Sequence, residues 1–243
     1  MNYQFNNEAS KMISIIVPAY NEEKRIKDML GIYGEYFFPR YPDCEFLVVC
    51  DGNDRTAAIV KSMSEVYKGI ILMEYKNRLG KGGGIMEGFK YAKGDVIAFV
   101  DADESVSPSD FEKIINELKI ADCAIGSRRV SGSTIVKKQP FKRATISRAF
   151  NLMVNLFFNL NIRDTQCGAK AFRKEAIVSV LPEIRSNGFE FDVELLWRIK
   201  NLGFSIREVP INWKHSEHSQ FSLKHAPSMF MNLMKIRFKS KRL

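Results

Sequence analysis

Short apolar runs alternate with helical patterns through the first half of the chain, and this alternation limits the possible folds more than any other sequence feature. Strands are predicted at residues 12–17, 45–50, 70–74, 96–100 and 122–125, because each run is short and rich in Ile, Val, Leu or Phe. Helices are predicted between them, at residues 22–36, 54–67, 82–92 and 109–118. Repeated βα units predict an α/β fold with a mostly parallel sheet, helices on both faces and ligands at the carboxyl ends of the strands.

The chain is predicted to form a single domain. Its 243 residues are 45% hydrophobic, which is enough for a full-sized core, and no internal repeat or Pro/Ser-rich linker divides it. The four cysteines show no metal-ligand spacing, so neither a zinc site nor a disulfide framework is expected, and a reducing cytosolic environment fits them. The N-terminus lacks a signal-peptide pattern, and no uncharged apolar stretch reaches the roughly 18 residues of a membrane span.

Positive charge is concentrated in two stretches of the chain. Lys and Arg together number 37 against 28 Asp and Glu, giving a net charge of +9. No acidic residue occurs between Asp122 and Asp164 or after Glu217, and these two stretches carry eight and six basic residues. The rest of the chain is therefore net acidic. Two acid-free basic stretches on an acidic body predict an anionic partner.

The basic residues flank apolar helical segments, which favours an anionic membrane surface over nucleic acid as the partner. In residues 149–160, Asn151, Asn155 and Asn159 form a narrow polar stripe on an otherwise apolar helix. Residues 226–243 alternate Met, Phe, Leu and Ile with Lys and Arg. Both segments are predicted to be amphipathic interfacial helices. The alternative is a helix packed into the core, followed by a basic tail.

Polar segments follow the predicted strands: VPAYNEE, VVCDGND, NRLGKGGG and FVDADES. The glycine run is not a P-loop, because it lacks the GxxxxGK[ST] spacing, and no GxGxxG follows the first strand. Asp101 and Asp103, two residues apart at a strand end, are suited to share a divalent cation such as Mg²⁺ or Mn²⁺. The alternative is a solvated turn. The three histidines, His215, His218 and His225, are expected as loop residues.

These motifs, continued by IGSRRV, DTQCGAKAFRKEA and FEFDVELLWRIKNLGFSIREVPINW, strongly resemble the family 2 glycosyltransferases with the GT-A fold, over residues 12–234. Within the family the chain is most similar to the dolichyl-phosphate and polyprenyl-phosphate glycosyltransferases. Its DTQCGAKAF and DADES segments are closer to the dolichyl-phosphate glucosyltransferases than to the mannose synthases. The resemblance implies a nucleotide-sugar-binding half at residues 12–127, an acceptor half at 128–225 and a basic amphipathic C-terminal segment at 226–243.

Carried over residue by residue, the resemblance assigns roles along the strand ends. Those implied to bind the nucleoside follow the first two strands: Pro18, Tyr20, Glu22 and Asp51. Lys81 would lie near the nucleotide-sugar, Asp101 would contact the ribose or a metal-bound water, and Asp103 would ligate Mg²⁺ or Mn²⁺. Two positions depart from the family pattern: Cys50 replaces the first Asp of a DDGSxD segment, and Ser105 stands where mannose synthases have a metal-contacting Gln.

In the resembling enzymes, arginines after the fifth strand hold the acceptor phosphate, and the matching region here contains Arg128, Arg129 and Arg143. A phosphate monoester is already largely dianionic at neutral pH, so it needs positioning more than deprotonation. Asp164 matches a position proposed as catalytic in related enzymes, although the residues themselves favour a role in orienting the acceptor or the sugar. Asp192 is a rival, together with Glu190, and one of these carboxylates would act as a base on a neutral acceptor.

The resemblance implies an inverting, metal-dependent transfer of a hexose, glucose being favoured, from a nucleotide-sugar to dolichyl or polyprenyl phosphate. UDP-glucose is the favoured donor, with GDP-mannose and UDP-N-acetylglucosamine as alternatives. The protein is expected to be cytoplasmic and peripheral on the cytosolic face of a membrane, with a membrane subunit or a homo-oligomer as further partners and no nucleic acid. Two alternative functions stay open: a GT-A glycosyltransferase for a glycan or other hydroxyl acceptor, and a non-catalytic basic module that binds membrane or nucleic acid.

Overall fold

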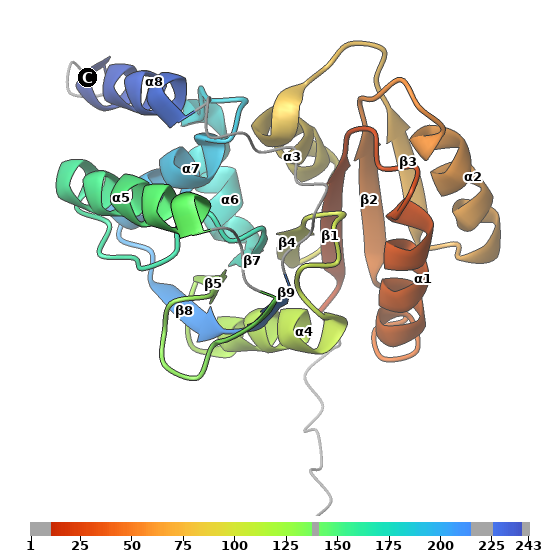
Figure 1. Cartoon of the computed structure of the whole chain (residues 1–243). Helices are drawn as coiled ribbons and strands as arrows, with labels where there is room; N and C mark the ends of the chain where they lie inside the picture. Colours follow the sequence, from red (N-terminus) through yellow and green to blue (C-terminus); the bar gives the residue numbers. More distant parts are fainter. Residues whose placement is uncertain (1–10, 138–140, 215–225, 240–243) are drawn as a thin grey trace, which may run out of the picture.

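The computed structural model describes residues 11–137, 141–214 and 226–239. Seven strands form one sheet in the order β3-β2-β1-β4-β7-β5-β8 (Figure 1). Their bounds are β1 (Ile13–Ala19), β2 (Glu45–Cys50), β3 (Ile70–Glu74), β4 (Val96–Val100), β5 (Cys123–Ser127), β7 (Ala169–Arg173) and β8 (Ile206–Pro210). All five predicted strands are present, and the mostly parallel α/β sheet predicted from them is confirmed.

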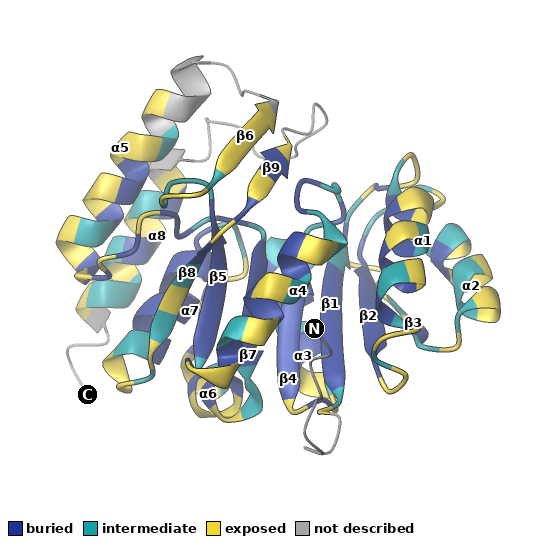
Figure 2. Ribbon diagram, turned by 90° about the horizontal axis from the view of Figure 1, so that it is seen from below, coloured by how far each residue is buried: buried dark blue, intermediate teal, exposed yellow. Residues whose placement is uncertain are grey.

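Helices cover both faces of the sheet, again as predicted (Figure 2). One face packs against α1 (Ile26–Phe37), α2 (Thr56–Val66) and α4 (Pro108–Asn116). The other packs against α3 (Gly80–Tyr91), α5 (Phe141–Phe158), α6 (Lys174–Val180), α7 (Phe191–Asn201) and α8 (Ala226–Lys239). Successive residues of β1 serve the two cores in turn, because strand side chains alternate between faces: Ile15 belongs to the first and Ile16 to the second.

Strand β7 runs antiparallel to both of its neighbours, β4 and β5, whereas the other pairs in the sheet are parallel. In the register of β4 and β7, Val100 pairs with Ala169. Strand β7 therefore begins where β4 ends. This reversal brings residues 164–168 to the sheet edge at which β1, β2, β4 and β5 have their carboxyl ends.

Shorter elements complete the fold. A second, two-stranded sheet pairs β6 (Thr134–Lys137) with β9 (Asn212–Lys214). An isolated bridge joins Val106 to Trp213, and the backbone N–H of Lys214 donates to the Ser105 carbonyl at 3.1 Å. The segments that follow β4 and β8 are thereby joined. Two 3₁₀ turns, η1 (Glu117–Lys119) and η2 (Leu181–Glu183), extend α4 and α6.

The asparagine stripe of α5 faces the protein interior. The Asn151 side-chain amide donates to the carbonyls of Ile162 (3.0 Å) and Arg163 (2.9 Å), and Asn155 exchanges two hydrogen bonds with the Ile162 backbone. Asn159, with φ of +49°, lies just beyond the helix end. The stripe therefore holds the chain that leads back to the sheet edge. Among the described residues, no helix has the length and apolar character needed to cross a membrane.

Candidate active site

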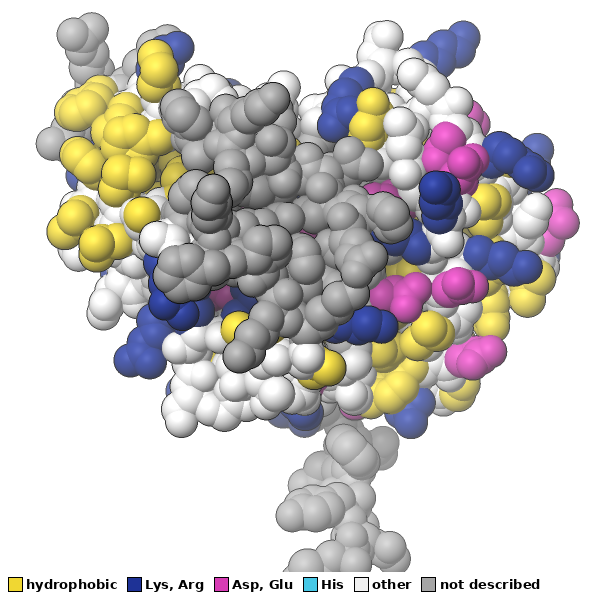
Figure 3. All heavy atoms as spheres, viewed as in Figure 1, with side chains coloured by type: hydrophobic (Ala, Val, Ile, Leu, Met, Phe, Trp, Pro, Cys, Tyr) yellow, Lys and Arg dark blue, Asp and Glu magenta, His cyan; other side chains and the backbone are white. Residues whose placement is uncertain are grey.

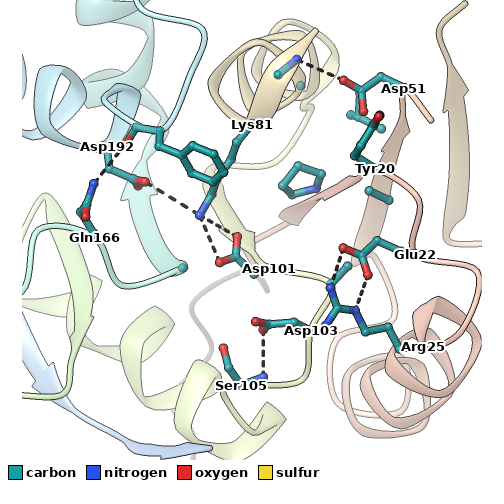
Figure 4. Close-up of a pocket in the computed structure, with 18 of the residues that line it drawn as sticks. Tyr20, Glu22, Arg25, Asp51, Lys81, Asp101, Asp103, Ser105, Gln166 and Asp192 are labelled. Atoms are coloured by element: carbon teal, nitrogen blue, oxygen red, sulfur yellow. Dashed lines mark hydrogen bonds and ion pairs between the residues drawn. The ribbon is translucent and has the colours of Figure 1, made fainter. Parts of the chain in front are cut away.

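The strand ends surround a cleft at the edge of the sheet (Figure 4). Nine of the residues predicted from the sequence line it: Pro18, Tyr20, Glu22, Asp51, Lys81, Asp101, Asp103, Arg128 and Asp192. Asp164 is buried beside Arg128. Arg129 contacts α5, as described below, and Arg143 lies in α5 with its side chain outside the described part of the structure. The three histidines also lie outside the described residues.

Lys81 is the central cation of the cleft. Its ammonium lies 2.8 Å from Asp101 Oδ1 and 3.8 Å from Asp192 Oδ2, and Figure 4 shows it reaching between these two carboxylates. Burial alone would lower the pKa of Lys81, but the carboxylates of Asp101 and Asp192 raise it above its usual value. Lys81 is therefore a permanent positive charge.

The glycine run of α3 allows Lys81 to reach this position. A Cβ atom on Gly82 would lie 2.5 Å from the Phe191 Cβ, and one on Gly80, whose φ is +78°, would lie 2.6 Å from the Asn187 carbonyl oxygen. Only glycine permits so close an approach and this backbone conformation. The run thus packs the start of α3 against the 187–191 segment. Asp51 holds the same helix start, because its Oδ2 accepts hydrogen bonds from the N–H groups of Leu79 (2.8 Å) and Gly80 (3.1 Å).

Asp101 and Asp103 follow β4 and are the candidate metal ligands. The backbone N–H of Asp101 donates to the Gly168 carbonyl at 2.9 Å, which fixes the backbone at this position. The Asp103 side chain is held by the N–H of Ser105, which donates to Asp103 Oδ1 at 3.1 Å. Burial and the nearby Asp103 raise the pKa of Asp101, while Lys81 opposes them.

The donor set suits Mg²⁺ or Mn²⁺. Two carboxylates from one strand end supply hard oxygen ligands, and Mg²⁺ is commonly held by one or two carboxylates together with substrate phosphates. Within the ranges that the structure describes, no third His, Cys, Asp or Glu joins them as a further ligand. Asp101 and Asp103 therefore fit a cation that is held jointly with a bound diphosphate.

Asp192, at the start of α7, lies between two lysines. Besides Lys81, it meets Lys170 of β7, whose ammonium donates to Asp192 Oδ1 at 2.5 Å and to a loop carbonyl at 2.6 Å. Lys170 is fully buried. Sequence reasoning missed it, and its only signal is a lysine inside the short segment AKAFR. The rival carboxylate Glu190 accepts a hydrogen bond from Asn232 of α8.

Arg128 and Asp164 form a buried, bidentate ion pair. Arg128 Nε and Nη2 donate to the two oxygens of Asp164 at 2.6 and 2.7 Å, and the Arg128 N–H adds a bond of 3.0 Å. Burial would raise the pKa of Asp164, but the Arg128 guanidinium holds it below its usual value. Asp164 is thus an ionised carboxylate that fixes Arg128 in the cleft.

Arg129 turns away from this pair. Its guanidinium donates to the Arg163 carbonyl at 2.9 Å and to Ser147 of α5 at 2.8 Å. Burial lowers the pKa of Arg129. Arg129 thereby ties the chain after β5 to α5, while Ser147 itself lines the cleft.

Two arginines that sequence reasoning missed stand at the β1 and β2 side of the cleft. The Arg78 guanidinium lies 3.4 Å from the centre of the Tyr20 ring, and Arg25 forms an ion pair with Glu22. Burial raises the pKa of Glu22, although Arg25 opposes the shift. Cys50, which departs from the family pattern, is buried at the end of β2, and this burial raises the pKa of its thiol to about 12.

Solved structures share this architecture. A glucosyl-3-phosphoglycerate synthase from Mycobacterium tuberculosis, in complex with Mn²⁺, UDP and phosphoglyceric acid, aligns with a TM-score of 0.69 at 20% identity. The alignment covers 94% of this chain and 79% of that one. A complex of the same synthase with Mn²⁺ and UDP-glucose aligns with a TM-score of 0.67 at 19% identity, over 93% and 77% of the two chains. The fold is therefore that of the GT-A glycosyltransferases.

Sequence comparison defines the family. Residues 14–181 match the model of Glycosyl transferase family 2, and the chain belongs to this family of glycosyltransferases. It is 32% identical over 236 residues to a dolichyl-phosphate beta-glucosyltransferase of Trichomonas vaginalis, covering 92% of this chain and 72% of that protein. The dolichyl-phosphate beta-glucosyltransferase of Saccharomyces cerevisiae is 30% identical over 231 residues, which cover 87% and 69% of the two chains.

Proposed function

We propose that this glycosyltransferase moves glucose from UDP-glucose to dolichyl or another polyprenyl phosphate, with inversion at the anomeric carbon and with a divalent cation. The observation that carries the proposal is that one cleft is lined by a carboxylate pair, Asp101 and Asp103, and by two fixed cations, Lys81 and Arg128. Such a cleft has a place for a metal-bound diphosphate and a place for a second anion. The similarity to dolichyl-phosphate beta-glucosyltransferases supports a lipid phosphate as that second anion.

In this proposal the donor diphosphate binds at Asp101, Asp103 and Lys81. The UDP-glucose and Mn²⁺ present in the structurally similar synthase support a uridine nucleotide and a divalent cation. Bound by the two aspartates, the cation would neutralise charge on the departing diphosphate. Lys81 adds a permanent positive charge beside them. Tyr20, with its ring under the Arg78 guanidinium, gives a flat surface for the nucleoside.

The acceptor phosphate binds at Arg128 in the same proposal. Two nitrogens of this guanidinium are used by Asp164, and Nη1 makes no hydrogen bond within the described residues, so it is left to donate to a phosphate oxygen. A phosphate oxygen then attacks the anomeric carbon, and the bond from that carbon to the diphosphate breaks on the opposite face. No proton has to be removed, because the second pKa of a phosphate monoester is about 6. Asp164 and Asp192, both held in ion pairs, position cations in this scheme.

The proposal includes a location at the cytosolic face of a membrane. A lipid phosphate acceptor requires access to a bilayer, and the four cysteines are free and buried, as suits a reducing compartment. Protease protection of the protein in sealed microsomes tests this location, since a cytosolic-face enzyme is digested without detergent.

A sugar-transfer assay tests the reaction. Purified protein is incubated with Mg²⁺ or Mn²⁺, a short polyprenyl phosphate and labelled UDP-glucose, UDP-N-acetylglucosamine or GDP-mannose. Label should enter the organic phase from UDP-glucose and fall at least a hundredfold in Asp103→Asn, while Asp43→Asn, an exposed aspartate away from the cleft, serves as the matched control. Label that enters only a glycan or another water-soluble acceptor would replace the lipid phosphate with that acceptor.

A further inference from the structure

Helices α5 and α8 lie side by side and expose apolar side chains together (Figures 1 and 3). The rings of Phe157 and Phe230 meet edge to face with centroids 5.5 Å apart, and Arg237 Nε donates to the Phe157 carbonyl at 3.3 Å. The exposed apolar residues, called the α5–α8 surface below, are Leu152, Met153, Leu156, Phe157, Met231 and Phe238. Leu156 is 73% exposed and Leu152 62%.

Helix α5 does not need this surface for its own packing. Its buried face consists of Phe150, Val154 and Phe158, and the inward-facing Asn151 and Asn155 add hydrogen bonds to it. The helix is thus apolar both toward the core and toward the outside. A contiguous apolar area on the outside of a protein indicates an interaction site.

The charges beside the α5–α8 surface identify what covers it. On α8, exposed Lys235 stands between Met231 and Phe238 at helical spacing, and on α5, exposed Arg148 precedes Leu152 by one turn. No acidic residue occurs from residue 123 to 163 or after Glu217. A second copy of the chain packed face to face would bring two such basic surfaces together, which is unfavourable. An anionic lipid surface complements both the apolar and the basic side chains.

We propose that the α5–α8 surface docks on an anionic lipid bilayer, with its Leu, Met and Phe side chains among the headgroups and Arg148 and Lys235 on lipid phosphates. Helix α5 also carries Ser147, which lines the cleft, so docking places the cleft beside the bilayer. That last consequence, delivery of a lipid acceptor, rests on the proposed function. The docking itself does not.

Vesicle flotation with the purified full chain, without donor or acceptor, tests the docking. The vesicles contain phosphatidylcholine alone or phosphatidylcholine with phosphatidylglycerol. Wild-type protein should float with the anionic vesicles, and Leu152→Ser/Leu156→Ser should lower the partition coefficient by about tenfold or more, given the apolar area of two leucines. The matched control is Val66→Ser/Ile120→Ser, in which two equally exposed apolar residues elsewhere are changed and binding is retained.

A second variant tests the charges. Arg148→Gln/Lys235→Gln should weaken binding to anionic vesicles by about fivefold per charge and leave binding to neutral vesicles unchanged. All variants replace exposed side chains, and a thermal melt verifies that each is folded. The proposal is overturned if the wild type ignores anionic vesicles, or if the leucine variant binds them as the wild type does. It is equally overturned if light scattering shows that the leucine variant turns a dimer into a monomer, since a second copy would then cover the surface.

Discussion

Replacing Gly168 by alanine should inactivate the enzyme without unfolding it. A Cβ atom on Gly168 would lie 1.9 Å from Asp101 Oδ2 and 2.3 Å from Asp101 Cγ, whereas an ordinary contact begins at 3.4 Å. The backbone of Gly168 is not in the left-handed region, so alanine is allowed there in its own right. The carboxylate of Asp101 must therefore move by more than an ångström.

The consequence for catalysis follows from the contacts of Asp101. This carboxylate meets Lys81 at 2.8 Å and stands beside Asp103, so its displacement misplaces a lysine contact and a candidate metal ligand together. Misplacement by an ångström costs about a hundredfold in rate, and we expect kcat/KM to fall by about that factor or more. The Asp101 side chain is 29% exposed and has room to move. The free energy of unfolding should therefore fall by only about 1 to 3 kcal/mol.

Sugar transfer and thermal unfolding of the same preparations measure both effects. The matched control is Gly31→Ala, because an added Cβ on Gly31 in α1 meets nothing within 4 Å, and it should keep full activity and gain about 0.5 to 1 kcal/mol of stability. In an Asp101→Ala background the clashing atoms are gone, so Gly168→Ala should add almost nothing. Retention of activity in Gly168→Ala, or an independent further loss in the double variant, would refute the steric reasoning.

Four further predictions concern two buried charges, the cysteine thiols and the metal. Lys170→Met should lower the free energy of unfolding by about 3 to 5 kcal/mol in urea titrations, because it leaves the buried Asp192 without its nearest cation, and an unchanged urea midpoint would contradict this. Asp164→Asn should raise the KM for the acceptor and leave that for the donor unchanged. Since Arg128 lowers the pKa of Asp164 from 3.8, the stabilisation by this pair is present above that value and is lost as the pH falls through the lower folded-state pKa. The difference in unfolding free energy between wild type and Asp164→Asn should therefore be flat from about pH 5 to 8 and shrink below about pH 4, and a slope near neutrality would count against it. Burial raises the pKa of three of the four cysteine thiols to about 12, so a disulfide reagent at about pH 8 should label none of them until the protein unfolds. Removal of divalent cations by EDTA should abolish transfer, reversibly with Mg²⁺ or Mn²⁺, and leave the melting curve unchanged, because Lys81 still pairs with Asp101.

The sheet of the first half and its cleft could be predicted from the sequence for a simple reason. Parallel strands that are buried on both faces require continuous apolar runs, and their carboxyl ends necessarily meet at one edge. The polar segments after β1, β2 and β4 could therefore be assigned to one site before their geometry was known. Asp51 shows the limit of this reasoning, since one of its oxygens is used to hold the start of α3.

Strand β7 and its lysine could not be predicted in the same way. The segment AKAFR carries two charges in five residues and shows neither a continuous apolar run nor regular alternation. It is stable in the centre of the sheet because Lys170 finds Asp192, 22 residues further along the chain. A partner at that distance has no local signature, and the same holds for Arg78 on Tyr20. The individual residues of such pairs can be read from the sequence, but the sequence does not show which residues pair with each other. Arg25 and Glu22 are only three residues apart, and this pair could have been found from its spacing.

Helix α5 shows why a correct pattern can still leave the direction of a helix open. The period of the asparagines identifies a polar stripe, and the usual rule would turn that stripe to water and the apolar remainder to the core. Here the 159–165 segment offers backbone donors and acceptors, so Asn151 and Asn155 are satisfied inside the protein. Once the polar stripe is used inside, part of the apolar surface must lie outside. The exposed Leu152 and Leu156 therefore follow from the inward-facing asparagines, and we expect the partner of this helix to be an apolar, anionic surface.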